Sequence, residues 1–82
     1  MRARITIMPK EGILDPQGVT VAKALAELGI KGIGEVRMGK FVELQLPKLT
    51  RKKAEAVTAA ACDRLLANPN IEGYQFDIVE GD

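Results

Sequence analysis

The sequence contains no histidine and no tryptophan, and it has a single cysteine, Cys62. Without histidine, the chain lacks the side chain that most often acts as an acid or base near neutral pH and most often binds a metal. One cysteine can form neither an intrachain disulfide nor a thiolate metal cluster. We therefore expect no disulfide framework, no metal site and no histidine-based active site in this chain.

Long apolar runs and an excess of one charge are also missing. No apolar segment approaches the roughly 18 residues that cross a bilayer, and residues 1–6 lack the apolar block of a signal peptide. Twelve basic residues stand against eleven acidic ones, for a net charge of +1, which argues against nucleic-acid binding by net charge. These features predict a soluble, cytoplasmic protein with no membrane or nucleic-acid partner.

The length of 82 residues predicts one small domain, residues 1–82. With 46% hydrophobic and 28% charged residues the composition is that of a globular protein. A chain of this size buries only a little over roughly 60% of its unfolded surface, so it is marginally stable as a monomer. We expect it to form oligomers.

Hydrophobic periodicity predicts four strands and two helices. Alternation of polar and apolar side chains marks strands at residues 2–8, 35–38, 41–46 and 74–78. Between the second and third strands, Gly39 and Lys40 fit a two-residue hairpin turn of type II′.

The helix boundaries are marked by capping residues. Asp15 and Pro16 are typical of a helix start, and Gly29 of its end. Thr50 can cap a second helix, which ends near Asn68 because the following proline disfavours helical backbone.

This element order, βαββαβ, predicts an α+β, ferredoxin-like fold with a four-stranded antiparallel sheet and both helices on one face. The other face would then carry Met8, Phe41 and Val79 among charged residues. Covering that face with a second copy of the chain is the simplest solution.

Candidate ligand-binding groups each have a plainer structural interpretation. The loop at residues 9–18 could hold an anion at the helix start, but it lacks a phosphate-binding fingerprint and Asp15 would repel the anion. Arg37 and Lys40 flank the predicted turn and could bind a phosphate or an acidic partner, or they could be solvated charges. The basic run at residues 51–53 opposes the helix dipole, which suggests either a partner surface or a solvated helix start.

Candidate catalytic groups are weaker still. Cys62 lies among alanines, which favours packing over nucleophilic chemistry. Glu35 and Glu43 could approach one another across the hairpin, but nothing gives them the different burial that an acid/base pair needs. RNA binding would require stacked aromatics where only Phe41 is present. An acylphosphatase-like site would require an arginine where the loop has only Lys10. The residues alone therefore favour a binding or assembly role.

Three segments together resemble a known family. They are residues 12–18 (GILDPQG), residues 36–40 (VRMGK) and residues 65–72 (LLANPNIE). In order and spacing they look like the hallmarks of PurS, the small subunit of bacterial phosphoribosylformylglycinamidine (FGAM) synthase. The resemblance runs from the first strand to the last.

The resemblance implies a role in de novo purine synthesis. In that family, a glutaminase subunit, PurQ, releases ammonia, and a larger synthetase subunit, PurL, uses ATP and magnesium to convert formylglycinamide ribonucleotide (FGAR) into FGAM. PurS contacts both and assists assembly and ammonia transfer without catalytic residues or cofactors of its own. The isolated chain would therefore be inactive. Family members form dimers, in some cases paired into tetramers.

The resemblance also implies site residues. Backbone geometry explains some matching positions, but folding alone does not account for others, which we expect to contact the partner subunits: Gln17, Arg37, Lys40 and Asn68. The remaining matches are expected to be structural: Leu14, Asp15, Pro16, Gly18, Gly39, Leu66, Pro69 and Glu72.

The sequence departs from the usual pattern at Pro9, which could shorten the first strand. It also departs at Asn70 and Gly73, which leaves contact details of the segment before the last strand open. Two alternatives also remain: a stand-alone ferredoxin-like regulatory module that binds a small ligand between protomers, and a small independent hydrolase.

Overall fold

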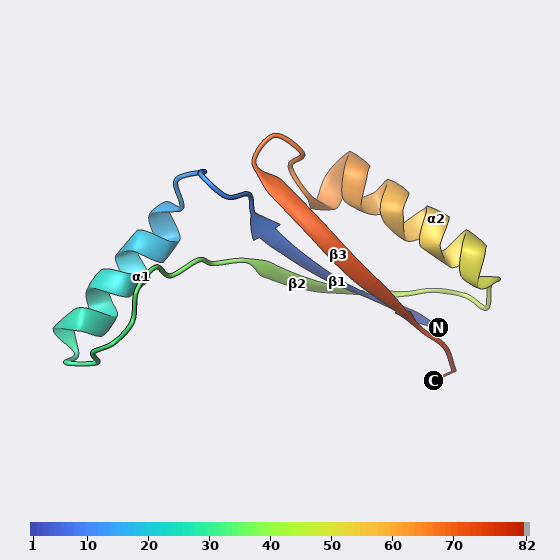
Figure 1. Cartoon of the computed structure of the whole chain (residues 1–82). Coiled ribbons are helices and arrows are strands. Elements are labelled where there is room, and N and C mark those ends of the chain that lie inside the picture. The colour runs from blue at the N-terminus through green and yellow to red at the C-terminus, as the bar shows by residue number, and fades with distance from the viewer. Residues whose placement is uncertain (82) are drawn as a thin grey trace.

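The computed structural model describes residues 1–81 and divides them into a sheet, a helix packed on it and a projecting helix (Figure 1). No helix among these residues is long and apolar enough to cross a bilayer. The elements in chain order are β1 (Arg2–Pro9), α1 (Pro16–Glu27), β2 (Lys40–Gln45), α2 (Arg51–Ala61), the π-helical turn η1 (Cys62–Leu66) and β3 (Glu72–Val79).

The sheet has three antiparallel strands in the order β2-β1-β3. Because side chains alternate between the two faces of a strand, Ala3, Ile5 and Ile7 all lie on one face of β1. All three are fully buried. Ile5 is paired with Val42 on one side and Phe76 on the other, so all three strands contribute to one apolar face.

Helix α2 covers this apolar face. Thr50 caps it as predicted, since its Oγ1 accepts a hydrogen bond from Lys53 N at 3.2 Å. Ala54, Thr58 and Cys62 follow at intervals of four residues and are fully buried. The helix then widens into η1, which ends before Pro69, so the predicted end near Asn68 is close to the observed one.

The opposite face of the sheet is open and largely polar. Arg4 lies between Glu43 and Asp77 on the neighbouring strands. Its Nε is 3.4 Å from Glu43 Oε2, and its guanidinium lies 5.3 Å from the centre of the Phe41 ring. The register places Met8, Phe41 and Val79 on this face as predicted. Because it is mostly charged or polar, however, this face needs a cover less than the sequence suggested.

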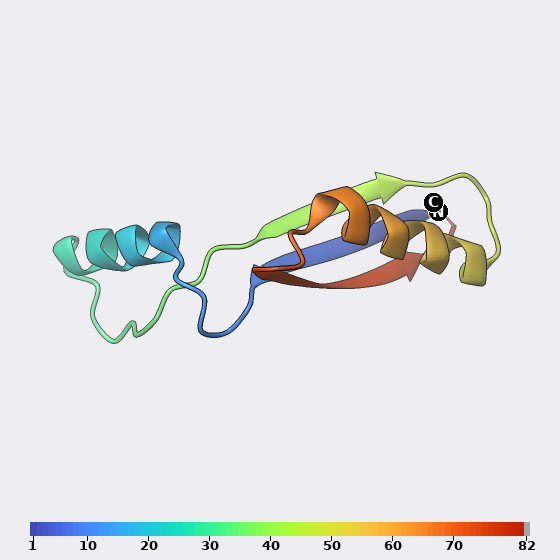
Figure 2. The same cartoon turned by 90° about the horizontal axis from the view of Figure 1, so that it is seen from above.

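Helix α1 does not pack on the sheet. Together with the segment that returns from it, it forms an arm, residues 16–38, that projects from one end of the sheet (Figures 1 and 2). The chain therefore measures 48 × 29 × 15 Å and has a radius of gyration of 16.2 Å. A compact chain of this length would have about 12 Å.

The arm overturns the predicted four-stranded, ferredoxin-like fold. Residues 35–38 form no strand, the Gly39–Lys40 hairpin does not exist, and only α2 lies on the sheet. The fold is α+β with three strands and two helices. The alternation at residues 35–38 is real, but Val36 packs against α1 instead of joining the sheet.

Candidate functional site

The arm joins the sheet through a region that we call the neck: residues 9–18, 36–40 and 66–72. All three segments that carry the family resemblance meet there. At its centre, the carboxylate of Asp15 caps α1 by accepting from Gly18 N at 3.1 Å. Its other oxygen accepts from Met38 N at 2.7 Å. The Asp15 side chain thus joins the start of α1 to the segment that returns from the arm.

These hydrogen bonds also set the charge state of Asp15. The amides of Met38 and Gly18, helped by Gln17 N and the nearby Arg37 guanidinium, lower the pKa of the Asp15 carboxyl below its ordinary value of 3.8. The carboxylate form is favoured because its partners are all donors or cations. Asp15 is therefore ionised at neutral pH, so both carboxylate oxygens can accept hydrogen bonds from Gly18 N and Met38 N.

Two glycines permit the close contacts of the neck. Gly18 is buried on α1, and a methyl group at its Cα would overlap the carbonyl oxygen of Val36. Gly39 lies at the end of the sheet, where a methyl group would overlap Met8 Sδ and the carbonyl oxygen of Ile7. Both positions require glycine because a side chain would not fit. The sequence analysis expected both residues to be structural but did not predict these close contacts.

Basic side chains bind backbone carbonyls around the neck. Arg37 donates to the carbonyl oxygen of Pro9. Lys10 Nζ donates to Pro69 O at 2.7 Å, while its backbone N–H donates to Ile71 O at 2.8 Å. These bonds join β1, the arm and the segment before β3.

Lys40 and Glu72 close the other side of the neck. Lys40 Nζ donates to Leu66 O at 3.2 Å and lies 3.9 Å from Glu72 Oε2. Glu72 Oε1 in turn accepts from Asn68 N at 2.7 Å, and Asn68 Oδ1 accepts from Asn70 N at 3.1 Å. The end of η1 is thereby fixed to the beginnings of β2 and β3.

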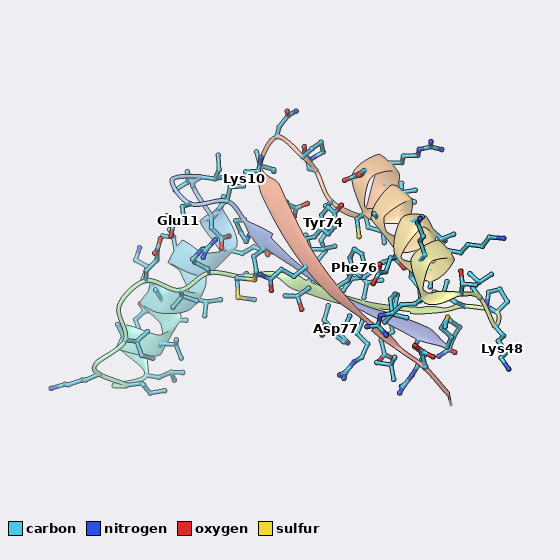
Figure 3. All side chains as sticks on the ribbon, turned by 45° about the vertical axis from the view of Figure 1, so that its right-hand side comes forward. Lys10, Glu11, Lys48, Tyr74, Phe76 and Asp77 are labelled. Carbon is cyan, nitrogen blue, oxygen red and sulfur yellow. The ribbon has the colours of Figure 1, made fainter. Side chains whose placement is uncertain are left out.

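A cavity of about 420 Å³ opens beside the neck on the polar face of the sheet. Figure 3 shows Lys10 and Glu11 at this end of the sheet. The cavity combines cations, an anion, an apolar floor and polar groups of β1 and β3; its lining includes Lys10, Glu11, Arg37, Met8, Thr6 and Gln75.

The predicted contact residues therefore gather in one region, but most of them are already engaged within the chain. The side chains of Arg37, Lys40 and Asn68 have the intramolecular partners given above. Gln17 is exposed on the first turn of α1, and its side chain has no partner among residues 1–81. Lys10 is the neck residue that sequence reasoning missed as a structural group, because a lysine in a loop carries no signal of the carbonyl it binds.

The other candidates do not form a reactive centre among the described residues. Burial raises the pKa of the Cys62 thiol, which favours an inert side chain. Glu43 pairs with Arg4 in the sheet while Glu35 lies in the arm, so the two glutamates do not meet as the hairpin prediction required. A hydrogen bond to Asp63 at 2.9 Å raises the pKa of Tyr74, which keeps that phenol protonated.

Side-chain hydrogen bonds to the backbone hold the neck together, an arm projects from the sheet, and a cavity with charged and polar lining lies beside the neck. These features are typical of a protein that binds or assembles with others. The comparisons with known proteins are more specific. The family model PurS, described as phosphoribosylformylglycinamidine (FGAM) synthase, matches residues 2–80. The chain belongs to the PurS family and is thus a non-catalytic subunit of FGAM synthase in purine biosynthesis.

Individual relatives cover nearly the whole chain. The PurS subunit of Synechocystis is 40% identical over 75 residues, which is 92% of this chain and 75% of the relative. That of Bacillus subtilis is 34% identical over 79 residues, 96% and 93% of the two chains.

Solved structures agree with the fold. The structure of Bacillus subtilis PurS matches with a TM-score of 0.87 at 34% identity and covers 96% of this chain and 98% of that one. A chain in the structure of PurLQS from Thermotoga maritima matches with a TM-score of 0.83 at 28% identity, covering 93% of each chain.

We expect Gly18→Ala and Gly39→Ala each to lower the free energy of unfolding by about 1–3 kcal/mol, because the added methyl must displace backbone atoms. Urea denaturation at fixed protein concentration measures this. Gly34→Ala is the matched control, since nothing lies within 4 Å of the position. It should be neutral or slightly stabilising. Equal behaviour of all three variants would contradict the packing argument.

The hydrogen bonds from Gly18 N and Met38 N to the Asp15 carboxylate should weaken in acid. Because the pKa of Asp15 is lower in the folded chain, its stabilising effect is complete above the unfolded pKa and is lost as the pH falls through the folded value. NMR titration should show the amide protons of Gly18 and Met38 shifting together below about pH 4. In Asp15→Asn this shared titration should vanish. Its persistence in the variant would mean that another acid is responsible.

Proposed function

We propose that this chain bridges the glutaminase and synthetase subunits of FGAM synthase and assists the transfer of ammonia between them. The observation that carries the proposal is the gathering of the three family segments in the neck. The match to a chain in the structure of PurLQS from Thermotoga maritima supports assembly with subunits of those two kinds.

The neck is the surface that we assign to contact with these partners. Gln17 is free to bind a partner directly. Arg37, Lys40 and Asn68 hold the carbonyls and turns that shape the surface, and their remaining exposed atoms are available for contact. The structural matches act beneath them: Leu14, Asp15, Pro16, Gly18, Gly39, Leu66, Pro69 and Glu72.

The chemistry itself belongs to the partners in this proposal. The complex converts FGAR, glutamine and ATP into FGAM, glutamate, ADP and phosphate, with ATP and magnesium bound on the synthetase subunit. Residues 1–81 contain no group of three or more cysteine, aspartate and glutamate side chains placed to hold a metal. We further propose that residues 1–82 form one domain, since the family match spans nearly all of it, and that it works in the cytoplasm.

We also propose that the chain works as a homodimer in which the arm of each copy packs on the other. Eight of the eleven exposed large hydrophobic side chains lie in the arm or neck: Ile13, Leu14, Val19, Leu28, Ile30, Ile33, Met38 and Ile71. Val42 and Leu44 of β2, on the same face as α2, are only half-buried. The arm of a second copy can cover them and bury its own apolar side chains there.

The bridging role is tested by reconstitution with PurL and PurQ, with and without this chain. Glutamine-dependent turnover should require the chain, and the chain alone should be inactive. If neither glutamine- nor ammonia-dependent turnover responds to the chain, the proposal is wrong.

Charge reversal at Arg37 and Lys40 should lower glutamine-dependent turnover. Heat stabilisation of the isolated chain by a metabolite would instead favour a ligand-binding regulatory module.

The dimer is tested with the double variant Val19→Asp and Leu28→Asp. The two side chains are 58% and 74% exposed, so their replacement should leave the protomer folded but place charges in the interface. Sedimentation equilibrium should show the Kd of the dimer rising at least about tenfold, which corresponds to about 1.4 kcal/mol. Lys23→Glu on the same helix is the control and should remain dimeric. An unchanged Kd for the double variant would exclude the arm as the dimer contact.

A further inference from the structure

A cluster of four cations lies at the end of the molecule away from the arm. It consists of Lys48 in the turn after β2 and of Arg51, Lys52 and Lys53 at the start of α2; we call it the cationic end. All four side chains are exposed, and residues 48–53 include no acid. The neck network does not involve any of them.

Most of this charge is unpartnered within the chain. Arg51 pairs with Glu55 at 3.5 Å and with Glu80 at 3.2 Å. The side chains of Lys48, Lys52 and Lys53 have neither an ion pair nor a hydrogen bond to any of residues 1–81. Three exposed positive charges within six residues of sequence therefore have no partner among residues 1–81.

The placement is also unfavourable for the helix. Lys52 and Lys53 are the second and third residues of α2, and its first turn contains no acid. Cations near a helix N-terminus oppose the positive end of the helix dipole. A glutamate at position 53 would instead complete a capping box with Thr50. Stability alone would select acids here, and a choice that lowers stability points to a function outside the fold.

The position of the cluster fits a bridging subunit. Figure 1 shows the start of α2 and the arm at opposite ends of the molecule, and Figure 3 shows Lys48 far from Lys10 and Glu11. A partner at the neck therefore leaves the cationic end accessible to a second partner. Lysines act as flexible point charges, which suits a salt-sensitive, electrostatic contact better than a precise polar pocket.

We propose that the cationic end docks onto an acidic protein surface of another subunit in the complex. This inference rests on the proposed function and assigns to the bridge its second contact surface. An overall net charge of only +1 makes a local protein contact a better fit than a nucleic acid, which would require a broader basic surface.

The test uses Lys52→Glu/Lys53→Glu and, as a control with the same change in charge, Lys23→Glu/Lys31→Glu on the arm. Binding to the reconstituted PurL and PurQ subunits is measured by biosensor between about 50 and 300 mM salt. The screening of charges strengthens over this range. The wild-type chain and the control should bind more weakly as salt rises. The α2 variant should bind at least about tenfold more weakly at low salt and show a flatter salt dependence.

Thermal unfolding separates this loss from misfolding. The α2 variant should melt at the same temperature as the wild type or a few degrees higher, about 2–6 °C, because it removes the dipole conflict and adds a cap. An unchanged or higher melting temperature together with weaker binding to PurL and PurQ is the result expected for a docking surface.

Two outcomes would overturn the inference: unchanged binding of the α2 variant, or a wild-type chain that binds RNA at physiological salt while its binding to the subunits shows no salt dependence. Failure of the wild-type chain to support glutamine-dependent turnover would be different. That result would reject the bridging function itself, whereas wild-type turnover with unchanged variant binding rejects only the cationic end.

Discussion

The carboxylate of Asp15 holds the start of α1 to the chain that returns from it, and the rest of the architecture depends on this contact. Because Met38 donates its amide to Asp15, the residues before it cannot extend β2 into a hairpin. Val36 then packs against Gly18, and Gly39 enters the sheet end where a larger residue would overlap Ile7 and Met8. The helix and its return segment become one arm, and the sheet keeps three strands.

An arm held away from the sheet leaves two incomplete surfaces in one chain. The arm exposes apolar side chains that a stable monomer would bury, and β2 carries half-buried residues beside α2. The polar face of the sheet, by contrast, carries a row of charged residues, Glu43, Arg4 and Asp77, in which Arg4 and Glu43 form an ion pair. The need for a second copy thus comes from the arm, not from the bare sheet face that the sequence had suggested.

Local signals in the sequence predicted most elements because each depends on neighbouring residues. The alternation of Ala3, Ile5 and Ile7 gave β1, and Asp15 and Thr50 gave the helix starts. The alternation at residues 35–38 was misassigned because a period of two indicates which side chains share a face but not which partner covers them. Long-range contacts such as Lys40 with Leu66 and Lys10 with Pro69 leave no local pattern. The predicted site residues fell in one region, but the intramolecular roles of three of them required the structure.

The central claim is that α1 does not pack on its own sheet and instead covers the apolar sheet face beside α2 in another copy. Isotope-filtered NMR on a dimer mixed from labelled and unlabelled chains tests this directly. We predict nuclear Overhauser effects from the methyl groups of Val19 or Leu28 in one copy to those of Val42 or Leu44 in the other. Contacts between these groups within a single copy only, with α1 folded beside its own α2, would contradict the claim.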